Sequence, residues 1–199
     1  MTTHSHGHES SAGASNRVKE LVAQLERRGI TTESELDRIV EKFLLKATPL
    51  NGAHLVARAW SDPAFKARLI ADAGAAIAEL GIDMSHWAPV KVRAVENTAR
   101  EHNVIVCTLC SCYPIALLGP SPAWYKSEGY RSRVVRDPRG VLTEFGLSLD
   151  SSVHVSVWDS TAELRYIVVP LRPPGTEGFT EEQLAKLVTR NGLIGTAAV

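Results

Sequence analysis

The sequence predicts an α+β fold, because helical segments come first and strands mixed with helices follow. Helical spacing of apolar residues marks four early segments: residues 17–28, 32–44, 51–60 and 63–80. Short apolar or alternating runs mark four later strands: residues 90–95, 104–107, 153–158 and 165–169. We therefore expect a sheet layer covered by helices, with a helical arm at the N-terminus.

Three regions follow from this pattern. Residues 1–16 are rich in Ser, Gly and His and are expected to form a disordered tail. Residues 17–48 should form the arm, in which Gly29 ends one helix and Thr32 with Glu35 caps the next. Its two helices have little to bury against each other, so it either wraps a partner subunit or covers the main domain, residues 49–199.

The later elements of that domain are expected to be a hairpin and a final helix. A polar turn at 159–163 separates the last two strands, which favours an antiparallel pairing between them. Thr180 and Gln183 form a second capping box, for a helix that runs to about Arg190. The basic stretch 125–139 is interpreted as a solvated or partner-facing helix rather than an anion site.

Composition excludes several classes of function. Lys and Arg together equal Asp and Glu in number, at 22 each, so there is no electrostatic case for binding nucleic acid or an anionic membrane. The N-terminus lacks an apolar signal-peptide core, and no apolar run is long enough to span a bilayer. With no cysteine pairs to oxidise and a thiol cluster to protect, the expected compartment is the cytoplasm.

All three cysteines, Cys107, Cys110 and Cys112, lie in one short run. Such a cluster is a poor disulfide framework but a good metal claw. The peptide nitrogens of Ser111 and Cys112 lie between two of the sulfurs, so a metal can bind two sulfurs and two nitrogens in a plane. Cys107 can then bind from one side, which leaves a sixth position for water or substrate.

Other interpretations of the cluster remain open. The thiols could be small core residues, a peroxide-sensing pair, or three ligands of a structural zinc with His102 as the fourth. Deprotonated peptide nitrogens, however, call for a strongly Lewis-acidic ion, such as low-spin trivalent cobalt or iron, and not for zinc.

The run Val106–Pro114 resembles the metal-binding signature of nitrile hydratase α subunits. Further segments resemble the same family, so most of the chain from about Leu21 onward is covered: residues 51–53, 56–60, 123–127, 130–133, 137–142, 158–166 and 193–195. The resemblance implies a layered α/β/α domain and a hydro-lyase that is active only with its β-type partner subunit and is loaded by a metallochaperone or activator.

The resemblance also assigns roles at the metal. It implies that Cys107 is the axial thiolate, Cys110 a sulfinate and Cys112 a sulfenate, with the nitrogens of Ser111 and Cys112 completing the ligand set. Cys112 and Ser111 are then the catalytic residues, because the sulfenate oxygen can either act as a nucleophile or orient a water molecule. Two arginines of the β subunit are expected to bind the oxidised sulfurs, so this chain alone should carry an incomplete site.

Residues around the ligands follow from the same resemblance. Thr108 and Tyr113 match the cobalt type, so we expect Co(III), with Fe(III) less favoured. Asp159 and Arg165 match positions beside the centre and at the subunit interface. The alternative is an ordinary turn carboxylate and an ordinary strand salt bridge.

The substrate pocket is expected to include Tyr113 and Ile115. The family usually has a Trp at the position of Ile115, so the pocket should be larger here. We therefore expect a bulky heteroaromatic or nucleoside nitrile as substrate. Family members that act on the nucleoside nitrile toyocamycin exist, and the chain is expected to resemble their α subunit.

Two other functions stay open at this stage. The γ subunit of thiocyanate hydrolase resembles the same motif, and a non-catalytic metal carrier or redox sensor would also use such a claw. The apolar stripe of the arm further predicts that the isolated chain self-associates.

Overall fold

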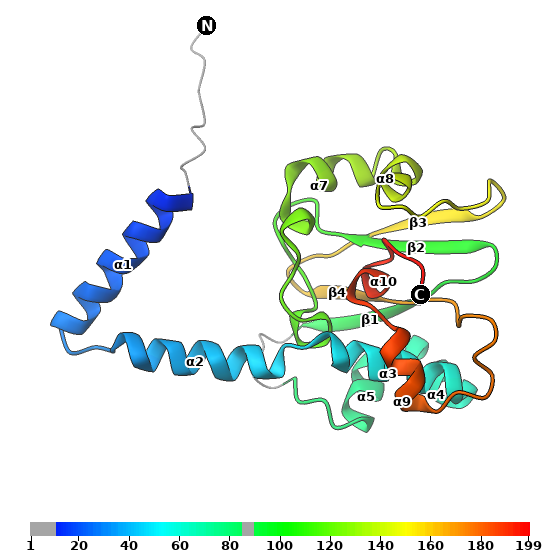
Figure 1. Ribbon diagram of the computed structural model, residues 1–199, viewed down its shortest axis with the longest axis horizontal. Coiled ribbons are helices and arrows are strands. Elements are labelled where there is room, and N and C mark those ends of the chain that lie inside the picture. The colour runs from blue at the N-terminus through cyan, green and yellow to red at the C-terminus, as the bar shows by residue number, and fades with distance from the viewer. Residues whose placement is uncertain (1–10, 85–89) are drawn as a thin grey trace, which may run out of the picture. The chain divides into compact units, whose positions relative to one another are not determined.

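The structure is a computed structural model that describes residues 11–84 and 90–199 (Figure 1). The expected tail histidines, His4, His6 and His8, lie outside the described residues. The chain divides into two compact units, residues 1–45 and 46–199. Within the described residues no helix is both long and apolar enough to cross a membrane. The cytoplasmic location expected from the unpaired thiols stays a prediction.

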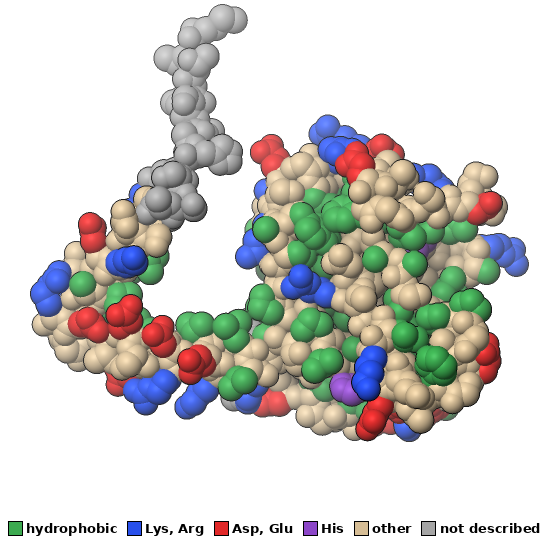
Figure 2. All heavy atoms as spheres, in the orientation of Figure 1, with side chains coloured by type: hydrophobic (Ala, Val, Ile, Leu, Met, Phe, Trp, Pro, Cys, Tyr) green, Lys and Arg blue, Asp and Glu red, His purple; other side chains and the backbone are tan. Residues whose placement is uncertain are grey.

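The first unit consists of helices α1 (Ser11–Arg27) and α2 (Glu33–Lys46, whose last residue lies past the boundary). Helix α1 begins at Ser11, so the expectation of a disordered tail through residue 16 is wrong for its last residues. The Thr32 capping box is confirmed: Thr32 N donates to Glu35 Oε2 at 2.9 Å, and Glu35 N donates to Thr32 Oγ1 at 3.2 Å. No residue of α2 is buried, and hydrophobic side chains lie along one side of it (Figure 2).

The second unit begins with α3 (Pro49–Ser61), α4 (Pro63–Ala71) and α5 (Ala73–Glu79). Asp62 caps α4, since its Oδ1 accepts from Ala64 N and Phe65 N. The single helix expected over 63–80 is wrong. Asp72 adopts extended φ and ψ and accepts a hydrogen bond from Ala75 N, so it ends one helix and caps the next.

In the described part of the chain, four strands form two separate parallel pairs (Figure 1). Strand β1 (Lys91–Glu96) pairs with β4 (Leu164–Val169), and β2 (Glu101–Val106) pairs with β3 (His154–Asp159). The predicted hairpin between the last two strands is therefore wrong. The turn after Asp159 carries the chain from one pair to the other, and the turn after β1 does the same in the opposite sense.

Helices cover both strand pairs, as expected for layered α and β elements. Helices α4 and α5 pack on β1, whereas α7 (Glu128–Val134) and α8 (Pro138–Glu144) lie beyond the other pair (Figure 1). The basic stretch 125–139 is thus not one helix: it begins in a 3-10 turn and continues through α7 into α8, with residues 135–137 between the two helices. Along the chain, two short elements separate β2 from these helices: α6 (Ile115–Leu118) and the 3-10 turn η1 (Ala123–Lys126).

The C-terminal segment closes the core. Helix α9 (Glu181–Leu187) has the predicted Thr180 and Gln183 box, and a separate helix, α10 (Arg190–Ile194), follows it. One helix to Arg190 was expected, but Val188 and Thr189 are extended and Thr189 caps α10 through Gly192 N. Gly195 then has φ of 89°, and an added Cβ would lie 1.9 Å from Asn103 O, so only glycine allows α10 to end against β2.

Candidate metal centre

The parallel register of β2 and β3 fixes where the cysteine loop lies. Val106 pairs with Asp159, and Ser160 N donates to Val106 O at 2.7 Å. The loop that begins at Cys107 therefore leaves the sheet at the carboxyl ends of both strands. Ligands of parallel sheets commonly bind at this edge.

The three sulfurs converge. The Sγ atoms of Cys107 and Cys110 are 3.6 Å apart, those of Cys110 and Cys112 are 3.3 Å apart, and all three lie within 4.8 Å of one another. Cys107 is 1% exposed, Cys112 is half-buried and Cys110 is exposed. The loop thus has a closed side at Cys107 and an open side at the other two sulfurs.

The backbone of the loop faces the sulfurs too. Cys110 N donates to Cys107 Sγ at 3.3 Å, and the N–H groups of Ser111 and Cys112 lie close enough to the Cys110 thiol to lower its pKa. These are the two nitrogens expected as ligands. Three sulfurs and two inward-facing nitrogens fit a soft, strongly Lewis-acidic ion in a five-ligand claw, since thiolates suit such ions and leave one position open.

The thiols differ in acidity. Hydrogen bonds from the Cys112 thiol, the Ser111 N–H, the Cys107 thiol and the Cys112 N–H lower the pKa of Cys110 to about 7. Burial and the neighbouring sulfurs raise the pKa of Cys112 to about 12, against the opposing charge of Arg165. Of this pair, Cys110 is the sulfur that gives up its proton first.

Asp159 holds the start of the loop. Its Oδ1 accepts from Thr108 N at 2.9 Å, and its Oδ2 accepts from Thr108 Oγ1 at 2.5 Å. The structure thus brings this predicted residue to the loop as a backbone anchor. Arg165 lies on β4 with its charge close enough to lower the pKa of Cys112, and its Nη1 donates to Leu164 O. Its expected roles beside the centre and at the subunit interface stay predictions.

Two further contacts were not predicted from the sequence. Arg131 Nη1 donates to both Thr108 O and Cys110 O at 3.3 Å, and Tyr125 Oη donates to Cys112 O at 3.0 Å. Both residues lie in segments that resemble the family, but their side-chain partners depend on how η1 and α7 pack beside the loop. The arginine had been interpreted as part of a solvated or partner-facing helix.

The residues expected in the substrate pocket are buried or half-buried. Tyr113 is 8% exposed and packs edge-on against Tyr125, with ring centroids 4.9 Å apart. Its Oη is buried without a hydrogen-bond partner in the described part of the chain, and burial raises the pKa of this phenol. Ile115 is half-buried at the start of α6. Their role as a pocket wall stays a prediction.

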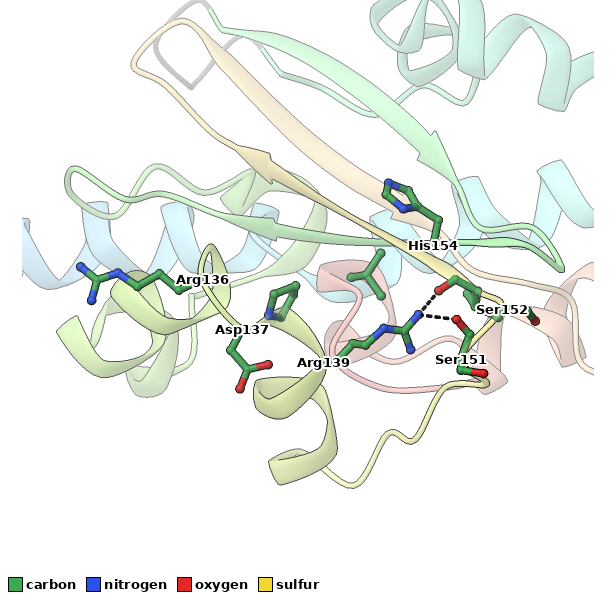
Figure 3. Close-up of a pocket in the computed structure, with 9 residues that line it drawn as sticks. Arg136, Asp137, Arg139, Ser151, Ser152 and His154 are labelled. Atoms are coloured by element: carbon green, nitrogen blue, oxygen red, sulfur yellow. Dashed lines mark hydrogen bonds between the residues drawn. The ribbon is translucent and has the colours of Figure 1, made fainter.

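A hollow of about 400 Å³ lies away from the claw, between Arg136–Arg139 and Ser151–Val155. Arg139 points into the segment that precedes β3, whereas Arg136 and Asp137 point away from it (Figure 3). Arg139 donates to the carbonyls of Leu149, Asp150, Ser151 and Val153. Its N–H groups are therefore engaged by backbone, which agrees with the expectation that the basic stretch is not an anion site.

The alternative of a structural zinc held by the three cysteines and His102 is wrong, because His102 is not available as the fourth ligand. His102 Nε2 donates to Gly195 O at 2.7 Å, and His102 Nδ1 accepts from Asn97 Nδ2 at 3.2 Å. Both ring nitrogens are therefore engaged far from the loop. Among the described residues, the only His, Cys, Asp or Glu cluster arranged to hold a metal is the cysteine triad.

Comparisons with known proteins agree with this donor set. The family model for the nitrile hydratase α chain matches residues 12–197. The chain is 51% identical over 181 residues to the low-molecular weight cobalt-containing nitrile hydratase subunit alpha of Rhodococcus rhodochrous, covering 91% of this chain and 86% of the relative. It is 44% identical over 173 residues to the thiocyanate hydrolase subunit gamma of Thiobacillus thioparus, covering 82% and 71%.

Solved structures give the same picture. A double mutant of the Fe-type nitrile hydratase from Comamonas testosteroni Ni1 superposes with a TM-score of 0.88 and 42% identity, covering 96% of this chain and 92% of that one. The fold is thus shared with an Fe-type nitrile hydratase, while the sequence is similar to cobalt-containing relatives.

Proposed function

Because the chain belongs to the nitrile hydratase α-chain family, we propose that it is the metal-binding subunit of a cobalt-dependent nitrile hydratase. Such an enzyme adds water to a nitrile and forms the corresponding amide. The observation that carries the proposal is the convergence of three sulfurs and two backbone N–H groups in one loop, at the carboxyl edge of a parallel strand pair.

Cobalt is the proposed ion, in its trivalent low-spin form. Two relatives from Rhodococcus rhodochrous are named as cobalt-containing, and Thr108 and Tyr113 match the cobalt-type motif. The Fe-type neighbour keeps Fe(III) as the less favoured ion. When bound, such an ion supplies Lewis acidity that polarises a nitrile or activates water.

The chain's own residues divide the remaining work. Cys107 would hold the ion from the buried side, while Cys110, Cys112 and the nitrogens of Ser111 and Cys112 would surround it. We propose that Cys110 carries a sulfinate and Cys112 a sulfenate. Exposure supports this division, because an oxidant can reach those two sulfurs and not Cys107. The sulfenate oxygen at Cys112 would then either act as the nucleophile itself or orient a water molecule beside the open position.

A partner subunit is needed to close this site. Leu109 is 86% exposed between two of the sulfurs, and Ser111 is exposed as well. Sulfinate and sulfenate oxygens are stabilised by cationic donors, and we propose that a β-type subunit supplies them after an activator has loaded the metal. The complete enzyme would therefore be a hetero-oligomer.

Metal analysis of the co-expressed complex tests the proposal. After growth with cobalt, we expect about one cobalt per chain that resists a chelator wash, and an intact mass raised by three oxygen atoms on Cys110 and Cys112. Zinc that mild chelation removes would contradict it, as would a cobalt-loaded complex without nitrile-hydrating activity.

Thiocyanate hydrolysis is the second candidate, because a thiocyanate hydrolase γ subunit is 44% identical over most of this chain. The same cobalt-loaded complex should be assayed with thiocyanate and with nitriles at equal concentration. A higher kcat/KM for thiocyanate would favour this second function.

The substrate proposal rests on Ile115, a half-buried side chain at the start of α6, close to the loop. A Trp lost from a pocket wall leaves room for a heteroaromatic ring, whose burial contributes apolar contact. We propose a bulky heteroaromatic or nucleoside nitrile, toyocamycin among them. In the wild-type complex, kcat/KM for such a nitrile should exceed that for acetonitrile.

The variant Ile115→Trp should reverse that preference, by about 10-fold or more, because the indole refills the space. Ile70→Trp, in a side chain that is 37% exposed on α4, is a control that adds the same group elsewhere. If the Trp at position 115 leaves the bulky substrate unaffected, the proposed role of this side chain is wrong.

A further inference from the structure

We propose that Arg131 is a positioning residue that holds the Ser111 nitrogen toward the metal. The proposal rests on the proposed function, because it assumes that the cysteine loop binds an ion. It concerns how the loop is shaped before the ion arrives.

The place of Arg131 is fixed by the helix that carries it. Ser127 caps α7 through Tyr130 N, and Tyr130 Oη donates to Ile105 O of β2 at 2.7 Å. The residue next to Arg131 is therefore bonded to the strand that leads into the cysteine loop. Helix and loop thus have a set spacing, which the arginine spans.

Arg131 uses one nitrogen to hold two loop carbonyls. Its Nη1 lies 3.3 Å from Thr108 O and 3.3 Å from Cys110 O. Cys110 O and Ser111 N belong to the same peptide, and all described peptide bonds are trans. In a trans peptide the C=O and N–H groups point in opposite directions. A carbonyl held by the arginine therefore turns the Ser111 N–H away from Arg131 and toward the sulfurs, which agrees with the lowering of the Cys110 pKa by this N–H.

The burial of one nitrogen of the half-buried Arg131 side chain supports a dedicated role. Arg131 Nε is buried and has no hydrogen-bond partner within residues 11–84 and 90–199. An unsatisfied buried donor is costly, so a surface arginine would normally extend into water. The side chain stays folded onto the loop, where its charge strengthens the bonds to both carbonyls.

The other anchors hold different peptides. Asp159 binds Thr108 at the start of the loop, and Tyr125 Oη donates to Cys112 O at its end. Among the side chains of the described residues outside the cysteines themselves, only Arg131 bonds to the peptide between Cys110 and Ser111. Loss of this contact should thus affect one expected ligand, the Ser111 nitrogen, without freeing the whole loop.

The test compares Arg131→Met with Arg131→Lys in the co-expressed complex grown with cobalt. Dissociation of cobalt into a chelator is measured beside the thermal unfolding midpoint. Arg131→Met should lose cobalt about 10 to 100 times faster than wild type, the range found when groups that orient metal ligands are removed. In Arg131→Lys, the rate of cobalt loss should stay within about threefold of the wild-type rate, because a single ammonium can also reach both carbonyls.

Arg133→Met is the matched control. Arg133 lies on the same helix but binds Glu144, with Nη1 2.9 Å from Glu144 Oε2, and it is exposed. It should retain cobalt like the wild type. If Arg131→Met retains cobalt as well as Arg133→Met does, the proposal is overturned. Faster loss of cobalt from both variants, with equally lowered unfolding midpoints, would overturn it too, because the loss would then follow from lower stability alone.

Two further measurements distinguish failure of the proposed function from failure of the proposal about Arg131. A wild-type complex that holds no chelator-resistant cobalt contradicts the proposed function itself, whatever the variants do. If Arg131→Met does not fold, Arg131→Gln replaces it, since a shorter amide cannot span both carbonyls. Wild-type retention in that variant then overturns the proposal.

Discussion

At the scale of single residues, the carboxylate of Asp159 binds both the N–H and the hydroxyl of Thr108. In Asp159→Asn, one carboxylate oxygen becomes an NH₂ group that cannot accept. We expect a loss of about 1–3 kcal/mol in the stability of this local contact and faster release of cobalt. Chemical denaturation and chelator-challenged cobalt retention measure the two effects.

Asp150→Asn is the matched control, because Asp150 also accepts from a backbone N–H and a hydroxyl, both of Ser152. It lies before β3 and away from the cysteine loop, so cobalt retention should not change. Equal cobalt loss in the two variants would show that Asp159 has no special part at the loop.

Residue identities predicted the sulfurs and nitrogens of the site because these lie within six consecutive positions. Asp159 could be named from the family resemblance, and its contact follows from the register with Val106. Arg131 and Tyr125 could not be predicted as partners of the loop. Their contacts arise from helix packing across more than ten residues of chain, which a local pattern does not encode.

The buried His102 gives a prediction about pH. Asn97 Oδ1 accepts from Asn103 N and Asn103 Nδ2, which turns the Asn97 Nδ2 group toward His102 Nδ1. The ring is thus held neutral, as an acceptor at Nδ1 and a donor at Nε2. Burial lowers its pKa, more than the bond to Gly195 O raises it.

The sign of the effect follows from proton linkage. The unfolded chain binds a proton at about pH 6.5, whereas folded His102 binds it only at lower pH. Unfolding is therefore favoured as the pH falls from about 6.5 toward the lowered pKa of the folded state. Urea denaturation at several pH values should show a flatter dependence for His102→Gln than for His54→Gln, a change at an exposed position of α3. Equal slopes would contradict the assignment.

At the scale of elements, strands were recognised better than their partners were. The alternation of 153–158 and 165–169 correctly predicted two strands, but the short turn between them suggested a hairpin that does not form. Each strand instead pairs in parallel with a strand more than fifty residues earlier. Local sequence favours extended backbone; the buried faces, Val104–Val106 and Ile167–Val169 among them, decide which strands meet.

The contact of α10 with β2 gives a prediction at this scale. Gly195→Ala places a Cβ 1.9 Å from Asn103 O and also requires a left-handed φ. The left-handed backbone conformation should lower the free energy of unfolding by about 1–2 kcal/mol, and overpacking against Asn103 should lower it by about a further 1–3 kcal/mol. Gly175 has a φ of 78° with open space around it, so Gly175→Ala should incur only the first cost. Similar unfolding free energies for the two variants would contradict this account of the contact.

At the scale of the whole molecule, the sequence indicated a subunit rather than a complete enzyme. The cysteine loop has an open side, and the first unit has apolar side chains without cover: Ile39 is 63% exposed and Leu44 is 46% exposed. Described residues of the same unit cover neither the open side of the loop nor these apolar side chains. The fold and the three sulfurs follow from one chain, whereas a pocket completed by a partner, as proposed, would keep the substrate from being predicted from this chain alone.

The last prediction concerns that apolar stripe. Without a partner, a helix with exposed Ile39, Val40 and Leu44 should associate with a second copy, because each contact removes apolar surface from water. We expect the isolated chain to sediment as a concentration-dependent oligomer. Ile39→Gln with Leu44→Gln should shift it toward monomer, whereas Glu41→Gln with Lys42→Gln, on the same helix and equally exposed, should not. Adding a β-type subunit should replace self-association with a hetero-oligomer in the wild type, and more weakly in the Ile39 and Leu44 variant. A wild-type chain that stays monomeric at all concentrations would show that the stripe does not drive association.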